Sequence, residues 1–146
     1  MDTMLLPPDF REFLRLLNSS NVEYLIVGGY AVGYHGYPRP TGDLDIWISN
    51  TPANAERVHR ALEEFGFDCP LPVLLQDNQV VRMGISPFRL EVLTTIDGVK
   101  FSECYRERVR GLIDGVEVTL ISLPRLLQNK KASGRSKDIT DLENLS

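Results

Sequence analysis

The sequence predicts an α+β fold in which helices pack on a mixed β-sheet. Three observations lead to this prediction. Some segments repeat apolar residues at helical spacing, short β-prone runs lie between them, and two turn signals each join a pair of such runs. The 146 residues contain no internal repeat, low-complexity tract or linker. A single domain over 1–146 is therefore expected, with closing helices at about 122–145 packed on it.

The first half of the chain alternates helical and extended patterns. In order, it predicts a helix over 9–18, a strand over 24–27, a short helix over 29–36, a strand over 44–49 and a helix over 52–65. The longer helix begins after Thr51-Pro52, a capping residue followed by a first-turn proline. Gly66 ends it. In the second strand, Trp47 lies on the same face as Asp45, so it is expected to pack beneath a neighbouring helix.

The second half predicts two hairpins and two closing helices. In order, it predicts a loop over 68–78, strands over 79–85 and 88–94, a short helix over 101–108, strands over 109–113 and 116–121, and helices over 122–132 and after Gly134. Ser86-Pro87 turns the first hairpin, and Asp114-Gly115 favours a type I′ turn in the second. The last helix has three apolar residues in register for a buried face: Ile139, Leu142 and Leu145.

Composition excludes several classes of protein. A net charge of −4 argues against a general nucleic-acid coat, although a basic strip occurs near the C-terminus. No apolar run approaches the length of a membrane span, and the N-terminus has no basic region typical of a signal peptide. The two cysteines have no metal-type spacing. A reduced, cytoplasmic setting without membrane contact is therefore expected.

Two acidic residues and a diglycine predict a metal-bound nucleotide. Asp43 and Asp45 are one residue apart on a predicted strand, so their side chains lie on one face. Two like charges this close are unfavourable unless a cation lies between them. Gly28-Gly29, just upstream, allows a polyanion to approach the backbone because no Cβ is in the way. Together they suggest a divalent metal that holds a nucleoside triphosphate.

A third carboxylate completes the predicted site. Glu91 lies between Leu90 and Val92 in another predicted strand, which would fix it in the sheet. Asp43 and Asp45 could bridge two ions, while Glu91 binds only the ion that activates the attacking hydroxyl. Oxygen ligands favour Mg²⁺ or Mn²⁺ as the cofactor.

These motifs, in their order along the chain, resemble the DNA polymerase β-like nucleotidyltransferase superfamily. The segments 27–31 and 39–47, and the C-terminal segment 131–142, are similar to small bacterial members related to abortive-infection and toxin nucleotidyltransferases. The resemblance extends over about 22–145 and implies a polymerase β-like fold.

Two positions depart from the pattern. Glu91 stands where many relatives have Asp, and Gly42 stands where they often have a polar or basic residue, which is expected to loosen the loop before Asp43.

Further residues are candidates for binding the nucleotide. Arg39 and Thr41 come just before the first acid, and Arg39 could pair either with a phosphate or with Asp43 or Asp45. In the basic strip, Lys131 is the candidate for the γ-phosphate, and contact with RNA is another possibility. The alternative is that the strip is a solvated face whose charges complement the helix dipole. The strip consists of Lys130, Lys131, Arg135 and Lys137, and Asp138 and Asp141 are expected to form ion pairs with it.

The sequence therefore predicts a metal-dependent nucleotidyltransferase that moves NMP from an NTP to an acceptor hydroxyl and releases pyrophosphate. The acceptor could be tRNA, a protein or a small molecule, and neither the NTP nor the oligomeric state is indicated. Two alternatives stay open. One is a catalytically weak module that binds a nucleotide or a protein partner, and the other is a component of a toxin–antitoxin system.

Overall fold

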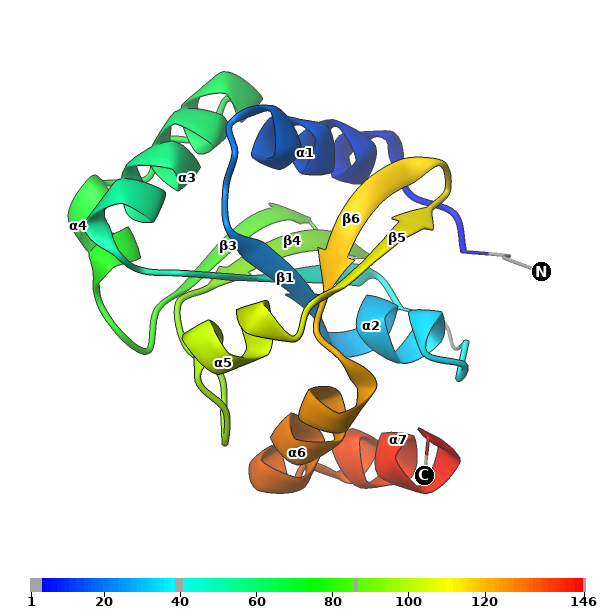
Figure 1. Cartoon of the computed structure of the whole chain (residues 1–146). Helices are drawn as coiled ribbons and strands as arrows, with labels where there is room; N and C mark the ends of the chain where they lie inside the picture. The colour runs from blue at the N-terminus through cyan, green and yellow to red at the C-terminus, as the bar shows by residue number, and fades with distance from the viewer. Residues whose placement is uncertain (1–3, 39–40, 86, 146) are drawn as a thin grey trace.

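The computed structural model describes residues 4–38, 41–85 and 87–145. Along the chain they form α1 (Pro8–Ser19), β1 (Tyr24–Val27), α2 (Gly28–Tyr34), β2 (Asp43–Ile48), α3 (Pro52–Phe65), α4 (Leu71–Leu75), β3 (Val80–Ile85), β4 (Phe88–Leu93), α5 (Phe101–Arg106), β5 (Val109–Ile113), β6 (Val116–Leu120), α6 (Leu123–Ser133) and α7 (Ser136–Leu145) (Figure 1). The predicted helices and strands are all present, with ends shifted by a few residues at most.

One predicted loop contains a helix. The segment 68–78 includes α4, which begins directly after Pro70 and has Pro72 in its first turn. A proline there loses no hydrogen bond, because the first N–H groups of a helix have no intrahelical partner. Leu74 is fully buried, so the short helix contributes to the core. The two prolines therefore start a helix instead of keeping the segment irregular.

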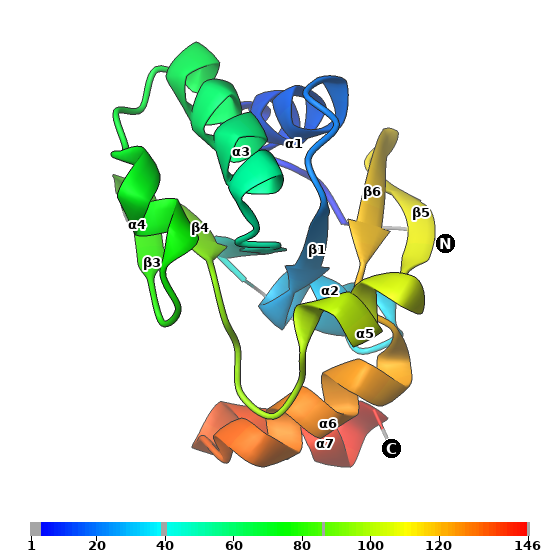
Figure 2. The ribbon, with the colours of Figure 1, turned by 60° about the vertical axis from the view of Figure 1, so that its left-hand side comes forward.

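The strands form one mixed sheet in the order β3-β4-β2-β1-β6-β5. The central strands β1 and β2 are antiparallel, whereas β4 runs parallel to β2 and β6 runs parallel to β1. Helices α1 and α3 cover one face of the sheet, and α2, α5, α6 and α7 lie on the other side (Figures 1 and 2). This mixed sheet between helices confirms the predicted α+β class.

Strand β2 separates the core from the candidate site by simple alternation. Leu44, Ile46 and Ile48 are fully buried on one face, and Asp43 and Asp45 point to the other. Trp47 shares the face of the acids and meets the ring of Phe101 on α5, with ring centroids 5.1 Å apart. The expectation that Trp47 packs beneath a neighbouring helix is thus confirmed.

The last two helices are joined by buried charges. Lys130 of α6 is only 2% exposed, and its Nζ lies 2.8 Å from Asp138 Oδ1 and 3.1 Å from Asp141 Oδ2 on α7. These contacts confirm the expected ion pairs between the acids and the basic strip. The predicted apolar register of α7 is wrong at Ile139, which is 50% exposed. The helix turns Asp138 and Asp141 inward because the buried ammonium of Lys130 needs partners.

Within the described ranges, no helix has both the length and the apolar character that crossing a membrane requires.

Candidate active site

The acidic residues of the site come from two neighbouring parallel strands. Asp45 on β2 lies in register with Glu91 on β4, and Asp43 lies in register with Arg89. Because the strands are adjacent and parallel, the side chains of Asp45 and Glu91 leave the sheet side by side. Both line a cavity of about 270 Å³ together with Gly28. The structure therefore brings together two of the three predicted acids and the diglycine turn.

Asp45 is held in an environment that disfavours its charge. Burial, then the charge and hydrogen bonding of Glu91, then Asp43, raise the pKa of Asp45 to about 7, while Lys137 acts in the opposite direction. Its Oδ1 atom is buried and has no hydrogen-bond partner among the described residues. A bound cation would satisfy this oxygen and offset the repulsion between the acids.

These residues fit a magnesium ion only in combination with a ligand. Among the described residues, no group of three or more His, Cys, Asp or Glu side chains is already arranged to hold a metal. Mg²⁺ in nucleotide enzymes is usually held by one or two carboxylates plus phosphate oxygens. Asp45 and Glu91 supply such a pair, and Asp43 follows on the same strand face. The oxygen donors and the unpartnered Oδ1 therefore fit the predicted cofactor.

Arg82 is a member of the site that sequence reasoning missed. It lies opposite Glu91 in the β3–β4 hairpin, and its Nε donates a hydrogen bond of 2.9 Å to Glu91 Oε2. The arginine side chain is 64% exposed, whereas that of Glu91 is 16% exposed. The pair thus joins a mostly buried carboxylate to a solvent-exposed cation.

The diglycine turn is packed directly against the acids. Gly28 has a φ of +68°, and a Cβ on it would overlap Asp45 Oδ2. A Cβ on Gly29 would lie 2.6 Å from Thr41 Oγ1. Only glycine gives both the backbone conformation and the space at position 28. The turn therefore brings the backbone close to Asp45 and Thr41, whose side chains lie where the sequence analysis expected a polyanion to approach.

Thr41 and Gly42, the described residues just before Asp43, contact neighbouring backbone, and the expectation that Gly42 loosens the loop stays a prediction. The backbone N–H of Arg89 donates to the Gly42 carbonyl at 2.9 Å. A Cβ on Gly42 would overlap the Pro87 carbonyl, so glycine is needed for this close approach. Thr41 Oγ1 lies 3.3 Å from the Asp43 carbonyl and 3.4 Å from its N–H. These contacts fix the start of β2.

Two cations that are paired with buried acids line the same cavity, together with Asp97. Arg135 lies between α6 and α7 and lines the cavity, as does the buried Lys130. Asp138 orients the arginine, since Arg135 Nε donates to Asp138 Oδ2 at 2.7 Å. Lys131, predicted to bind nucleotide, is exposed on α6 and is not among the residues that line the cavity. Arg39, another predicted ligand, lies outside the described residues.

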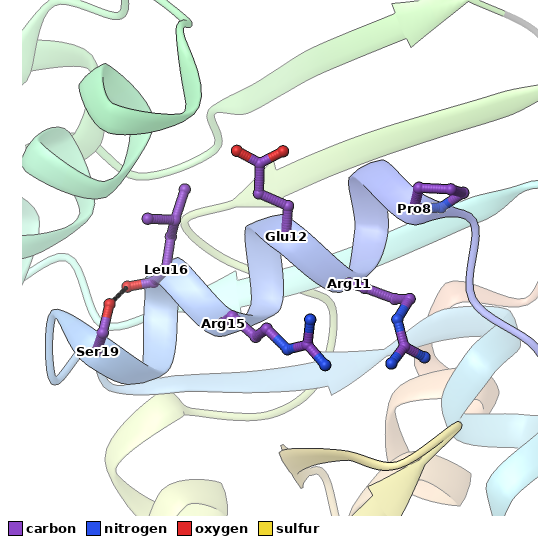
Figure 3. A pocket seen from close by; sticks show the side chains of 6 residues that line it. All are labelled: Pro8, Arg11, Glu12, Arg15, Leu16 and Ser19. Carbon is purple, nitrogen blue, oxygen red and sulfur yellow. Dashed lines mark hydrogen bonds between the residues drawn. The ribbon is translucent and has the colours of Figure 1, made fainter.

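Two other cavities lack comparable chemistry. One of about 440 Å³ lies on the outer surface of α1, where Arg11 and Arg15 extend to one side and Glu12 to the other (Figure 3). Arg11 is engaged by Asp114 at 2.8 Å. The other, of about 370 Å³, is mostly apolar and lies by Phe10 and Phe88. The cavity at Asp45 is therefore the strongest candidate among the described residues.

A mixed sheet that presents paired acids beside a glycine turn is the arrangement that the sequence predicted for a nucleotidyltransferase. A model of the family described as "Nucleotidyl transferase of unknown function (DUF2204)" matches residues 8–146. The chain therefore belongs to this family, and it is an enzyme of the nucleotidyltransferase class. No match was found among curated proteins.

Solved structures share the fold. TM1012 from Thermotoga maritima, assigned as a nucleotidyltransferase, has a TM-score of 0.64 at 14% identity, covering 97% of this chain and 95% of its own. The lincosamide antibiotic adenylyltransferase LnuA, bound to lincomycin, has a TM-score of 0.62 at 14% identity, covering 98% of both chains. An antigenic nucleotidyltransferase-like protein from Paracoccidioides brasiliensis has a TM-score of 0.55 at 20% identity. The match covers 92% of this chain and 71% of that protein. These identities support a common fold only.

Proposed function

We propose that this protein transfers NMP from an NTP to an acceptor hydroxyl in a reaction that depends on Mg²⁺ or Mn²⁺ and releases pyrophosphate. The observation that carries the proposal is the position of Asp45. Its carboxylate lies beside Glu91, has one buried oxygen without a partner among the described residues, and lines a cavity of about 270 Å³ together with Lys130 and Arg135. An anionic substrate bound together with a cation fits this arrangement of charges.

Asp45 and Glu91 would hold the metal, with Asp43 as a further ligand. When bound, the metal lowers the pKa of the acceptor hydroxyl and neutralises charge on the triphosphate. Glu91, on the neighbouring strand β4, would hold only the ion that activates the acceptor hydroxyl, as the sequence analysis predicted. Asp45 lies between Glu91 and the glycine turn, and so contacts both sides of the site. The carboxylates are fixed by the sheet, which provides the positioning that phosphoryl transfer requires.

The triphosphate would lie in the cavity lined by Gly28 and Arg135. Gly28 brings the backbone against Asp45, and Arg135, oriented by Asp138, lines the same cavity. Lys137 is close enough to Asp45 to lower its pKa, so it adds positive charge to the same region. Preorganised cations of this kind stabilise the charge that develops on the leaving pyrophosphate. Gly29, Thr41, Arg39 and Lys131 stay predicted nucleotide contacts.

The direct test is incubation with each of four α-labelled NTPs, with Mg²⁺ or Mn²⁺, in the presence of candidate acceptors. Wild type should transfer label to an acceptor, and Asp45→Asn and Asp43→Asn should lose transfer while staying folded. Glu64→Gln, an exposed acid on α3 behind the sheet, is a matched control that should keep full activity. Full turnover in Asp45→Asn would overturn the assignment.

A catalytically weak nucleotide-binding module is the second candidate. It is favoured by the finding that the part of the chain seen in the structure has no preassembled group of three acidic ligands. Thermal stabilisation by NTP and Mg²⁺, without label transfer to any acceptor or to the protein itself, would select this candidate. Transfer of label would exclude it.

A further inference from the structure

The outer strands of the sheet carry an open, basic surface next to the acids. On the face that bears Asp45, alternate positions of β3 and β4 are occupied by Arg82, Gly84 and Arg89, all of which are exposed. Helices α5, α6 and α7 lie on this side of the sheet (Figure 2), yet these residues stay accessible to solvent. The surface is therefore available to a partner that reaches Glu91 from the free edge of the sheet.

The strand register aligns each arginine with an acid. Asp45, Glu91 and Arg82 form one row across β2, β4 and β3, and Asp43 and Arg89 share the next row. Neighbouring strands are about 4.8 Å apart, so the Cα atom of each arginine lies within about 10 Å of that of the acid in its row. Positive charge thus flanks the acids on the side opposite Arg135.

The internal contacts of the two arginines differ. Arg82 donates one hydrogen bond to the mostly buried Glu91, and a divalent cation on Glu91 would release the arginine. Arg89 forms no ion pair with the residues that the structure describes. Both guanidinium groups can therefore receive an external anion. The fork of N–H donors in arginine matches phosphate oxygens especially well.

From this geometry we infer that Arg82 and Arg89 bind successive phosphates of a single-stranded polynucleotide acceptor, whose terminal hydroxyl reaches Glu91. The inference rests on the proposed nucleotidyl transfer and names its acceptor class. The two arginines are diagonal neighbours on β3 and β4, about 7–8 Å apart at their Cα atoms. That spacing suits two phosphates joined in a flexible strand, whereas a neutral small molecule would leave both cations unused.

The acidic balance of the whole chain limits this interaction to the neighbourhood of the site. With a net charge of −4, the protein has no general attraction for nucleic acid. Binding should therefore be weak, involve few phosphates and depend strongly on these two residues. It should also weaken with added salt, because each phosphate contact releases counterions.

The first test measures binding of a fluorescein-labelled single-stranded RNA, with a free 3′ hydroxyl, by anisotropy over a series of salt concentrations. Arg82→Gln/Arg89→Gln should weaken binding about tenfold and reduce the slope of log K against log salt by about 0.7 per lost contact. Arg60→Gln, which removes an exposed arginine from α3 behind the sheet, should change affinity less than about twofold. Arg82→Lys/Arg89→Lys should keep the wild-type slope. Equal affinity and slope in the Gln double variant and in Arg60→Gln would overturn the inference.

The second test uses the transfer reaction and separates this inference from the proposed function. With RNA as acceptor, Arg89→Gln, which keeps the Arg82–Glu91 pair, should raise the KM for RNA about threefold and leave the KM for NTP within about twofold. Label transfer to a protein or a small molecule, at equal rates in the double variant and in Arg60→Gln, would overturn the inference and preserve the proposed function. If wild type transfers no label to any acceptor but binds RNA through these arginines, the proposed function is wrong. The assignment of Arg82 and Arg89 as a phosphate-binding surface is then retained.

Discussion

Asp45 and Glu91 lie directly opposite each other on the parallel strands β2 and β4, and Oδ1 of Asp45 is buried without a hydrogen-bond partner among the described residues. A buried polar atom without a partner costs free energy, and two adjacent carboxylates add repulsion. The register of β2 and β4 places the two carboxylates side by side, so the fold itself imposes both costs. A cation that binds here would relieve both, and this is the physical basis of the proposed metal binding.

Mg²⁺ should therefore stabilise the protein through Asp45. With Mg²⁺ and NTP at about 100 times their apparent Kd, wild type should gain about 2.7 kcal/mol. This corresponds to roughly 5 to 10 °C in Tm for a domain of this size. Asp45→Asn should lose most of the shift, and Glu64→Gln should keep it. Thermal unfolding with each cation and NTP, alone and together, measures the effect. A full shift in Asp45→Asn would place the binding elsewhere.

The raised pKa of Asp45 gives stability a defined dependence on pH. Because burial and Glu91 raise its pKa to about 7, the folded protein holds the proton more tightly than the unfolded chain does. Protonated Asp45 therefore makes its full contribution to the free energy of unfolding below about pH 4. This contribution is lost as the pH rises through 7. Asp45→Asn stays neutral, so it should match wild type near pH 4.

At pH 8 the same variant should be more stable than wild type by about 2 kcal/mol, a figure reduced for the partial exposure of the carboxyl group. Urea unfolding in EDTA at several pH values measures this difference. A variant that is less stable than wild type at pH 8 would contradict the assigned environment of Asp45.

Much of the fold could be predicted because local signals are strong. The turn signals Ser86-Pro87 and Asp114-Gly115 in the sequence predicted both hairpins, and the apolar run Tyr24–Val27 predicted β1. The face of α7 was not predictable from periodicity. Its inward residues, Asp138 and Asp141, are polar, and they are buried only because Lys130 comes from another helix. A contact between helices leaves no periodic pattern in either segment.

The sequence predicted the acids of the candidate site on both strands, but it did not predict Arg82 or the position of Arg135. Alternation places Asp43 and Asp45 on one face, but pairing of β2 with β4 joins segments far apart in the chain. Arg82 could have been found, because a hairpin turned at residues 86 and 87 sets residue 82 opposite residue 91. Arg135 could not, since its position depends on how α6 and α7 close over the cavity.

Gly28→Ala should impair both folding and activity. The position has a φ of +68°, and the added Cβ would overlap Asp45 Oδ2. The backbone conformation alone should cost about 1–2 kcal/mol, and the overlap displaces the carboxylate. Gly115→Ala also lies at positive φ, but nothing is near its Cβ, so it controls for the backbone. Both variants should lose stability in urea, and only Gly28→Ala should lose metal-dependent stabilisation. Equal effects on both properties would contradict the close packing at Gly28.

Breaking the buried ion cluster should be costly. Lys130→Met removes the cation shared by Asp138 and Asp141 and leaves two buried carboxylates with less compensation, which should cost about 3–5 kcal/mol at pH 7. The triple variant Lys130→Met/Asp138→Leu/Asp141→Leu removes all three charges and should recover much of that loss. Denaturant unfolding measures both. A triple variant as unstable as Lys130→Met would show that the cluster contributes net stability.

Lys131 and Lys137 offer a direct comparison of two candidate nucleotide contacts. Both side chains are exposed, but Lys137 is close enough to Asp45 to lower its pKa, whereas Lys131 does not line the cavity. We expect Lys137→Gln to raise the KM for NTP about three- to tenfold and Lys131→Gln to change it less than about twofold. Because each variant removes one positive charge, the difference between them reports position and not net charge. Initial rates over a range of NTP concentrations measure both values. A larger effect in Lys131→Gln would instead support the γ-phosphate contact indicated by the sequence, and it would place the triphosphate along α6 rather than beside the start of α7.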